Sequence, residues 1–87
     1  MVEREVEVQN RAGIHARPAA LIVKVANKFA SNLYMEKDRM KINGKSIMGI
    51  ITLGAAYKSR LIISTEGPDE TEAADAIEQL FINRFEE

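Results

Sequence analysis

Apolar and acidic side chains alternate along the first residues of the chain. The sequence interleaves Val2, Val6 and Val8 with Glu3, Glu5 and Glu7. A period of two predicts a strand with one buried face, and residues 9–14 then form a loop.

The next apolar residues recur at helical spacing and predict a helix over Ala19–Phe29. One face at i, i+3, i+4 and i+7 should point to the core, and it consists of Ala19, Ile22, Val23 and Ala26. The other side consists of Arg17, Ala20, Leu21, Lys24 and Lys28. Cations mixed with small apolar groups fit either ordinary solvent-facing surface or a docking surface.

The second half of the chain predicts three strands and two helices. Strands over 33–37 and 40–42 are joined by a tight turn at Asp38-Arg39, and a further strand covers 61–65. The apolar run 47–53 fits a buried strand or a short helix, and Ser46 as N-cap favours the helix. Gly54 is available to end it.

A last helix follows Gly67-Pro68 and begins with Asp69 and Glu72 as a capping-box-like pair. Its apolar stripe consists of Ala73, Ala74, Ile77, Leu80, Phe81 and Phe85. The order β-α-β-β-α-β-α over residues 1–87 predicts one α+β domain of two layers, with helices on one face of a mixed or antiparallel sheet. Because only 6% of residues are aromatic, aliphatic side chains must fill the core.

Charge is distributed unevenly along the chain. Residues 11–60 hold ten of the twelve basic residues and two acids, Glu36 and Asp38. This predicts a basic face, which is either solvated surface or a surface for an acidic partner. The basic stretch lacks the aromatic strand positions that stack bases, so we expect no nucleic acid partner. With no apolar run long enough for a bilayer, we expect a cytoplasmic protein without membrane insertion.

The chemistry-bearing segment is Gly13-Ile14-His15-Ala16-Arg17-Pro18, which contains the chain's one histidine. Proline is favoured in a first helical turn, so His15 falls at or just before a helix N-terminus, where backbone N–H groups favour an anion. A neutral imidazole has a lone pair that can attack phosphorus, and Arg17 offers paired donors to phosphate oxygens. The segment therefore indicates phosphoryl transfer. We expect no metal site, because the chain has one histidine and no cysteine.

The segment from Gly13 to Ala19 resembles the phosphorylation-site signature of HPr, the histidine-containing phosphocarrier family of the bacterial phosphotransferase system. Lys45-Ser46-Ile47-Met48-Gly49 resembles the second signature of that family, around a regulatory serine. Chain length and element order agree as well. The resemblance implies an open-faced sandwich, with four antiparallel strands covered on one face by three helices.

The resemblance also implies a function. His15 would accept a phosphoryl group through Nδ1 from phospho-enzyme I, charged by phosphoenolpyruvate, and pass it to an enzyme IIA domain of a sugar permease. Arg17 would stabilise the phosphate. Such a protein is a carrier without a cofactor rather than an enzyme, and we expect a monomer.

Ser46 would be phosphorylated by the HPr kinase/phosphorylase, with a catabolite-control regulator as a further partner. The expected docking residues are Ala20, Leu21, Lys24, Ile47, Met48 and Ile51.

Two points stay open. Many family members have glycine shortly before the last strand, where this chain has Lys58, which we expect to be strained or in a rearranged loop. The alternative function is that of a regulatory HPr-like protein, of the nitrogen-related branch or independent of permeases, that acts by binding transcription factors or enzymes. HPr-like regulators that do not carry phosphate usually lack the histidine that is present here as His15, but the nitrogen-related branch keeps it.

Overall fold

The computed structural model describes residues 1–86 as one α+β unit. In chain order its elements are β1 (Val2–Glu7), α1 (Ala16–Ala26), β2 (Asn32–Lys37), β3 (Met40–Asn43), α2 (Ile47–Leu53), β4 (Arg60–Glu66), α3 (Glu70–Ile82) and the short 3-10 helix η1 (Arg84–Glu86). The sequence-predicted order is therefore confirmed.

The strands form a four-stranded sheet in the order β1-β4-β2-β3, and every pairing is antiparallel. The first strand pairs with the last along its whole length, from Val2 opposite Thr65 to Glu7 opposite Arg60. The turn between β2 and β3 places Asp38 at φ 52° and Arg39 at φ 68°, the left-handed pair that a tight hairpin needs.

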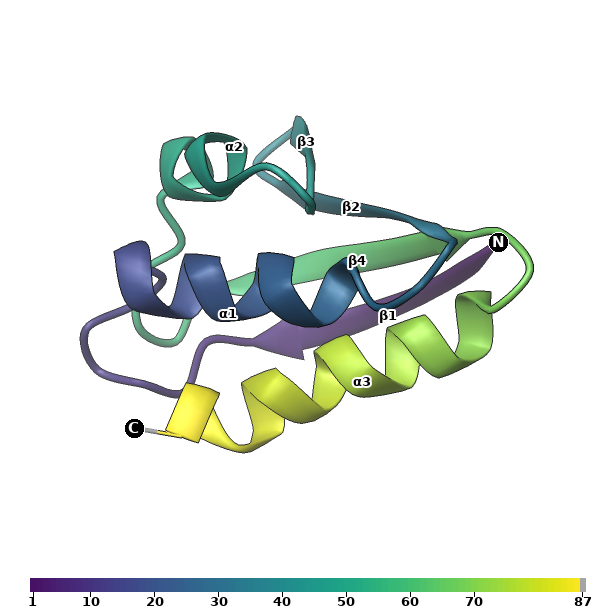
Figure 1. The fold of residues 1–87 in the computed structure, drawn as a ribbon. Coiled ribbons are helices and arrows are strands. Elements are labelled where there is room, and N and C mark those ends of the chain that lie inside the picture. The colour runs from purple at the N-terminus through teal and green to yellow at the C-terminus, as the bar shows by residue number, and fades with distance from the viewer. Residues whose placement is uncertain (87) are drawn as a thin grey trace.

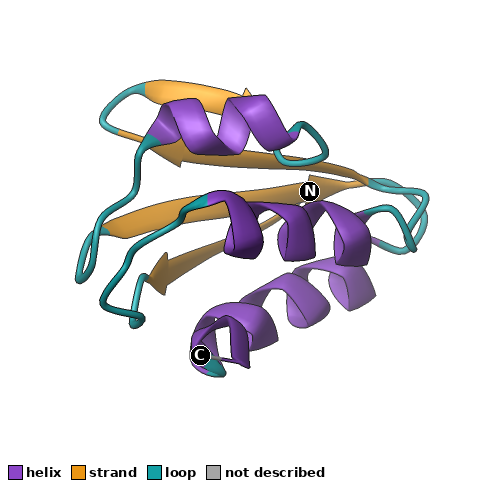
Figure 2. Ribbon diagram, turned by 60° about the vertical axis from the view of Figure 1, so that its left-hand side comes forward, coloured by secondary structure: helices purple, strands orange, loops and turns teal. Residues whose placement is uncertain are grey.

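All three α-helices cover the same face of the sheet, so the prediction of an open-faced, two-layer sandwich is confirmed (Figures 1 and 2). Side chains that alternate along the strands point into the space between the layers and meet the apolar faces of α1 and α3. The largest fully buried side chains include Ile22, Leu33, Met35, Leu61, Ile63, Ile77 and Phe81. The core is therefore mainly aliphatic, as the composition requires.

Arg4 lies on the helix-facing side of β1 and ties that strand to α3. Its Nη1 donates to Asp75 Oδ1 over 2.6 Å and to Glu78 Oε1 over 2.7 Å. These hydrogen bonds, to Asp75 and then to Glu78, raise the pKa of the Arg4 guanidinium above its ordinary value.

Helix α1 begins and ends earlier than the apolar pattern predicts. It starts at Ala16 rather than Ala19, because His15 serves as its N-cap, and it ends at Ala26 rather than Phe29. Beyond Ala26 the chain turns, and the N–H groups of Ala30 and Ser31 donate to the Asp69 carboxylate.

That contact corrects the predicted capping box of α3. Asp69 stands at the N-cap position but makes no side-chain cap bond, since its carboxylate accepts from the turn after α1 instead. Glu70, rather than Glu72, reaches back, and its Oε1 accepts from the Gly67 N–H over 3.1 Å.

The apolar stripe of α3 also ends earlier than predicted. The helix stops at Ile82, and Phe85 belongs to η1, where residues 84–86 all have positive φ. Phe85 is nevertheless buried, with its ring edge-to-face against Phe81 at 4.8 Å between centroids. The left-handed turn, not a continued helix, brings this side chain back to the core.

None of the helices within residues 1–86 has both the length and the apolar character needed to cross a membrane.

Candidate functional site

The loop between β1 and α1 holds the backbone just before His15 in a fixed shape. Asn10 is buried, and its Nδ2 donates to the Gly13 carbonyl over 2.7 Å, while the Gly13 N–H donates to the Asn10 carbonyl over 3.1 Å. The Ile14 N–H donates to the Ala55 carbonyl over 2.9 Å. The loop is thus tied both to itself and to the segment after α2.

Gly13 is required by this arrangement for two reasons. Its φ of +75° lies in the left-handed region, and a Cβ there would stand 2.8 Å from the Ala55 carbonyl oxygen. Any other residue would push the loop away from residues 55 and 56, and His15 is only two residues further on.

His15 is the N-cap residue of α1, in an extended conformation with φ −98° and ψ −167°. Its carbonyl accepts from the Ala19 N–H over 3.0 Å, and its own N–H donates to the Gly13 carbonyl over 3.2 Å. The imidazole does not cap the helix, and the residue is exposed. The backbone therefore starts the helix while the side chain stays accessible to another molecule.

The first turn of α1 is suited to an anion. It contains no acidic residue, and the N–H groups of Ala16 and Arg17 have no acceptor within the helix. Pro18, the third helical residue, has no N–H to leave unsatisfied. The exposed Arg17 guanidinium adds a full positive charge to the positive end of the helix dipole. The structure thus places His15 and Arg17 at the same helix end.

Ser46 lies at the N-cap of α2, as predicted from the sequence. Its Oγ accepts from the Gly49 N–H over 3.0 Å, and its carbonyl accepts from the Ile50 N–H over 3.0 Å. The helix ends at Gly54, which has the left-handed φ of 64° and so confirms the predicted stop.

Directly after Ser46, α2 exposes an apolar patch that consists of Ile47, Met48 and Ile51. These side chains are 41%, 71% and 39% exposed, whereas Ile50 on the opposite side is fully buried. Helix α2 packs beside α1, so this apolar patch lies on the helix next to the one that His15 caps (Figure 2).

The predicted docking residues on α1 differ from one another in burial. Ala20 and Lys24 are exposed, whereas Leu21 is partly buried and packs against the core. Leu21 therefore offers a partner less exposed surface than its position among the cations in the sequence predicts.

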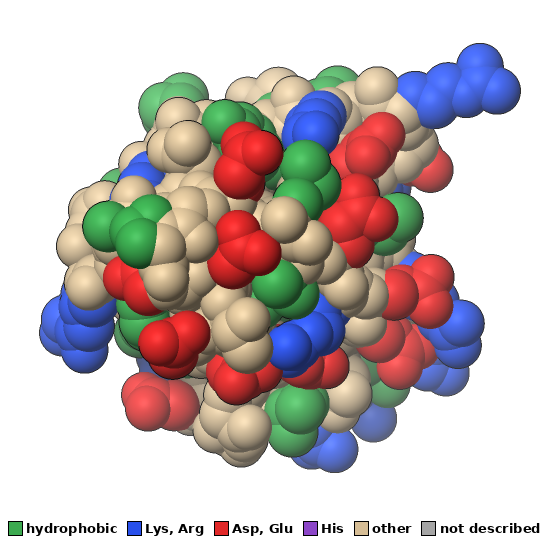
Figure 3. All heavy atoms as spheres, turned by 90° about the vertical axis from the view of Figure 1, so that its right-hand side faces the viewer, with side chains coloured by type: hydrophobic (Ala, Val, Ile, Leu, Met, Phe, Trp, Pro, Cys, Tyr) green, Lys and Arg blue, Asp and Glu red, His purple; other side chains and the backbone are tan. Residues whose placement is uncertain are grey.

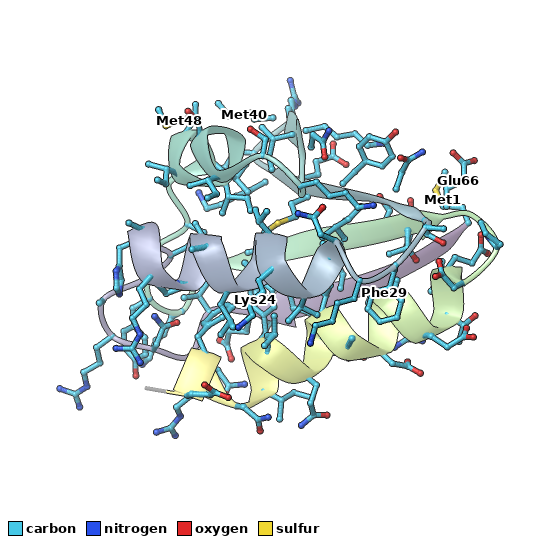
Figure 4. The ribbon with its side chains drawn as sticks, viewed as in Figure 1. Met1, Lys24, Phe29, Met40, Met48 and Glu66 are labelled. Atoms are coloured by element: carbon cyan, nitrogen blue, oxygen red, sulfur yellow. The ribbon has the colours of Figure 1, made fainter. Side chains whose placement is uncertain are left out.

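Met40 is an exposed apolar residue that the sequence analysis missed. It lies at the start of β3, is 44% exposed, and is found on the same edge of the molecule as Met48 (Figure 4). The sequence holds a signal for this residue. Met40 is two residues before Ile42 in the same strand, so both side chains lie on the helix-facing side of the sheet. The seven-residue α2 is too short to cover the whole of this edge.

Acidic side chains gather at the other end of the molecule. Figure 3 shows many of them on the end where β1 begins and where β4 leads into α3. Glu66 ends β4 there, Asp69 is the N-cap of α3, and Glu70 and Glu72 lie in the first turn of that helix. Basic residues Arg17, Lys24 and Lys28 instead lie along α1 or just after it. Of these, Arg17 lies at the end that carries His15, where the first turn of α1 has no acidic residue, so this end favours an incoming anion.

Within residues 1–86, histidine and carboxylate side chains do not gather in threes as a metal site would need.

Comparison with known proteins agrees with this geometry. Residues 2–83 match the family model "PTS HPr component phosphorylation site". The chain is 52% identical over 87 residues to the phosphocarrier protein HPr of Treponema pallidum, covering 100% of this chain and 99% of the relative. It is 49% identical over 77 residues to the HPr-like protein Crh of Halalkalibacterium halodurans, covering 88% and 92%. A crystal structure of HPr from Thermoanaerobacter tengcongensis superposes with a TM-score of 0.96 at 47% identity, covering 100% and 98%.

Proposed function

The chain belongs to the HPr family of phosphotransferase-system phosphocarriers, and on that basis we propose that His15 receives a phosphoryl group from phospho-enzyme I and passes it to an enzyme IIA domain. The protein would act as a cytoplasmic monomer in sugar transport. The observation that carries the proposal is the exposed His15 imidazole at the N-cap of α1, next to Arg17.

The proposed transfer step is a displacement at phosphorus. The lone pair on His15 Nδ1 forms a new N–P bond while the bond between phosphorus and enzyme I breaks, and its electron pair stays with enzyme I. The ring proton remains on Nε2. Because no proton has to leave the imidazole during the step, the site needs no separate general base.

The surroundings of His15 fit a temporary phosphoryl group. The N–H groups of Ala16 and Arg17 and the Arg17 guanidinium can bind the phosphoryl oxygens as charge develops on them. These donors are at the surface rather than in a closed pocket, so water weakens each contact. The group would be stabilised without being trapped, as transfer to a second partner requires.

The test is incubation with phosphoenolpyruvate and enzyme I, followed by mapping of the labelled residue. We expect an acid-labile, base-stable phosphoprotein that is absent in His15→Ala. Arg17→Ala should still be labelled, but more slowly, whereas Arg60→Ala, an exposed arginine in β4, should behave as the parent. Labelling of His15→Ala by the same system would refute the assignment.

We further propose that Ser46 is a regulatory phosphorylation site for HPr kinase/phosphorylase, and that a catabolite-control regulator reads its state. The support is its place at the start of α2, directly before the apolar patch. A phosphate of about −2 charge at a helix N-terminus is tolerated by the free domain. At the edge of a docking surface the same charge must be desolvated, which opposes binding of an acidic partner.

The second candidate function is regulation without phosphoryl transfer. It is supported by the 49% identity to the HPr-like protein Crh. In that case partners would bind the apolar patch, and no enzyme IIA domain would accept phosphate from this chain. Mixing phosphorylated protein with the enzyme IIA domains of the same organism separates the two. Transfer to any of them establishes the relay, and retention of the label with all of them favours regulation.

A further inference from the structure

A hollow that plays no part in the proposed relay lies beside the loop that leads to His15. It has a volume of about 450 Å³ and is lined by Gln9, Asn10, Arg11, Ala12, Tyr57 and Arg84. A neighbouring compartment of about 290 Å³ shares Gln9, Tyr57 and Arg84 and adds Lys58. Figure 1 shows why these segments meet: η1, at the end of the chain, lies close to the loop between β1 and α1.

The lining of the two compartments is cationic. Among residues 1–86, Arg11, Lys58 and Arg84 bring three positive charges to this lining, and Glu7 brings one carboxylate. All three cations are exposed, so they can turn towards a ligand. Arg17 does not line either compartment, so this group of cations is separate from the one at the start of α1.

Two of these cations occupy backbone positions that glycine would adopt at lower cost. Lys58 has φ 71° and Arg84 has φ 55°. Left-handed backbone at a non-glycine residue is uncommon and is concentrated at functional sites. Lys58 and Arg84 are far apart in the sequence, yet each places a long basic side chain at the same hollow.

Tyr57 gives the hollow an apolar wall between its cations. Its ring lines both compartments, and the Lys58 ammonium lies 5.5 Å from the ring centroid. Gln9, on the opposite strand end, also lines both and offers an amide donor and acceptor. This lining combines guanidinium groups, an amide and an aromatic ring. It suits an organic anion better than an inorganic ion, because the ring can contact the organic part of the ligand.

We propose that this hollow binds a small organic phosphate, a phosphomonoester about the size of a hexose phosphate. Two guanidinium groups match a phosphate dianion, because each presents paired N–H donors to its oxygens. The volume falls in the range of roughly 300–1,000 Å³ that is usual for small-molecule sites. The non-phosphate part of the ligand would lie against Tyr57 and Gln9.

Occupancy of the hollow would reduce phosphorylation of His15. The hollow borders the loop whose Gly13 and Ile14 pack on residues 55 and 56, and its Lys58 N–H donates to the Val8 carbonyl over 2.8 Å. A bound dianion therefore lies next to the segment that positions the imidazole. It would also repel a phosphoryl group that approaches the same end of the molecule.

The test is a titration of the full, unphosphorylated chain, followed by backbone amide chemical shifts in NMR. The probes are glucose 6-phosphate, inorganic phosphate and glucose. We expect saturable shifts with glucose 6-phosphate, centred on residues 9–12, 57–59 and 84, weaker binding of inorganic phosphate and none of glucose. Arg11→Gln and Arg84→Gln should each weaken binding roughly tenfold, the effect of one charged hydrogen-bonding group. Arg60→Gln, a surface arginine outside the hollow, should leave it unchanged.

Other outcomes would overturn the proposal. Shifts that centre on His15 and Arg17 and persist in Arg84→Gln would show that the phosphate binds only at the helix start. Equal affinity for inorganic phosphate would remove the role of Tyr57. If Arg84→Gln slows transfer from enzyme I while the parent shows no saturable shifts, the hollow is part of a protein interface instead. Because the titration uses the unphosphorylated chain, its result does not depend on the relay proposed for His15.

Discussion

Substitutions at Ser46 should separate the stability of the domain from its competence in phosphoryl transfer. The Ser46 side chain has two distinct properties in the structure: its Oγ caps α2 through the Gly49 N–H at 3.0 Å, and it adjoins the apolar patch. Alanine removes the cap and adds no charge, asparagine keeps a cap acceptor without charge, and aspartate keeps the acceptor and adds a charge.

The stability effect follows from the cap alone. Replacing an N-cap serine by alanine costs about 1 kcal/mol, within a range of roughly 0.5–2 kcal/mol. For a domain of this size that lowers Tm by about 4–8 °C. Ser46→Asn and Ser46→Asp should stay within about 0.5 kcal/mol of the parent, because both residues are good N-caps. A carboxylate is additionally favoured by the helix dipole.

The transfer effect follows from the charge alone. Because Met48 is 71% exposed and Ile47 41%, a partner that covers them must also desolvate an adjacent carboxylate. We expect Ser46→Asp to lower the rate of transfer from enzyme I roughly tenfold or more, a penalty of at least about 1.4 kcal/mol in the complex. Ser46→Ala and Ser46→Asn should transfer at the parental rate.

Thermal denaturation followed by circular dichroism measures the effect of each substitution on stability. The initial rate of labelling by phospho-enzyme I measures its effect on transfer. The reasoning is wrong if Ser46→Asn loses transfer together with Ser46→Asp, because side-chain size would then explain the effect. It is also wrong if Ser46→Ala melts at the parental temperature. Higher salt should partly restore transfer by Ser46→Asp, since exposed charges are screened.

Three further substitutions test features of the fold. Lys58→Gly should raise the free energy of unfolding by about 1 kcal/mol in denaturant titration, because φ 71° strains any residue with a Cβ, and Lys58→Ala should give no such gain. Asp69→Asn should flatten the loss of stability on acidification. Hydrogen bonds from the Ser31 hydroxyl and from the Ala30 and Ser31 N–H groups hold the pKa of Asp69 below its ordinary value of 3.8, so its contribution to stability is present above that value and is lost as the pH falls through the lowered pKa. Gly13→Ala should cost about 1–3 kcal/mol and slow His15 labelling, with unchanged labelling contradicting the role of the loop.

Features set by a few neighbouring residues could be predicted from the sequence. Ser46 and Gly54 bracket a run of seven residues, and their preferences for the two ends of a helix resolved an otherwise ambiguous apolar segment. His15 and Arg17 are two residues apart, so a helix start between them was enough to bring them to one place. The alternation along the strands was enough to predict a mixed or antiparallel sheet with helices on one face, and the resemblance to a family added that all four strands are antiparallel.

Features set by contacts distant in sequence could not be predicted. An aspartate before an apolar run has the same local pattern whether it caps its own helix or reaches another turn. Asp69 does the latter, and its partner Ser31 is 38 residues away. The burial of Phe85 depends on three successive left-handed residues, for which the sequence offers no glycine. The hollow beside Tyr57 is formed by three segments that are separate in the sequence. The sequence therefore could not predict that its cations are neighbours in space.

The same surface must serve two partners in the proposed relay, and the construction of the site fits that demand. His15 is positioned through its backbone, by bonds with Gly13 and Ala19, so its side chain can meet a donor and later an acceptor without rearrangement of the loop. Arg17 and the exposed residues of α2 stand on two short helices that are fixed by the core. Glu66, Asp69, Glu70 and Glu72 lie at the far end of the molecule, where they do not repel an anion that approaches His15. In a carrier built in this way, any contacts that distinguish the donor from the acceptor must come from the partners. Substitutions that strengthen one interaction on this surface should therefore slow the other half of the relay.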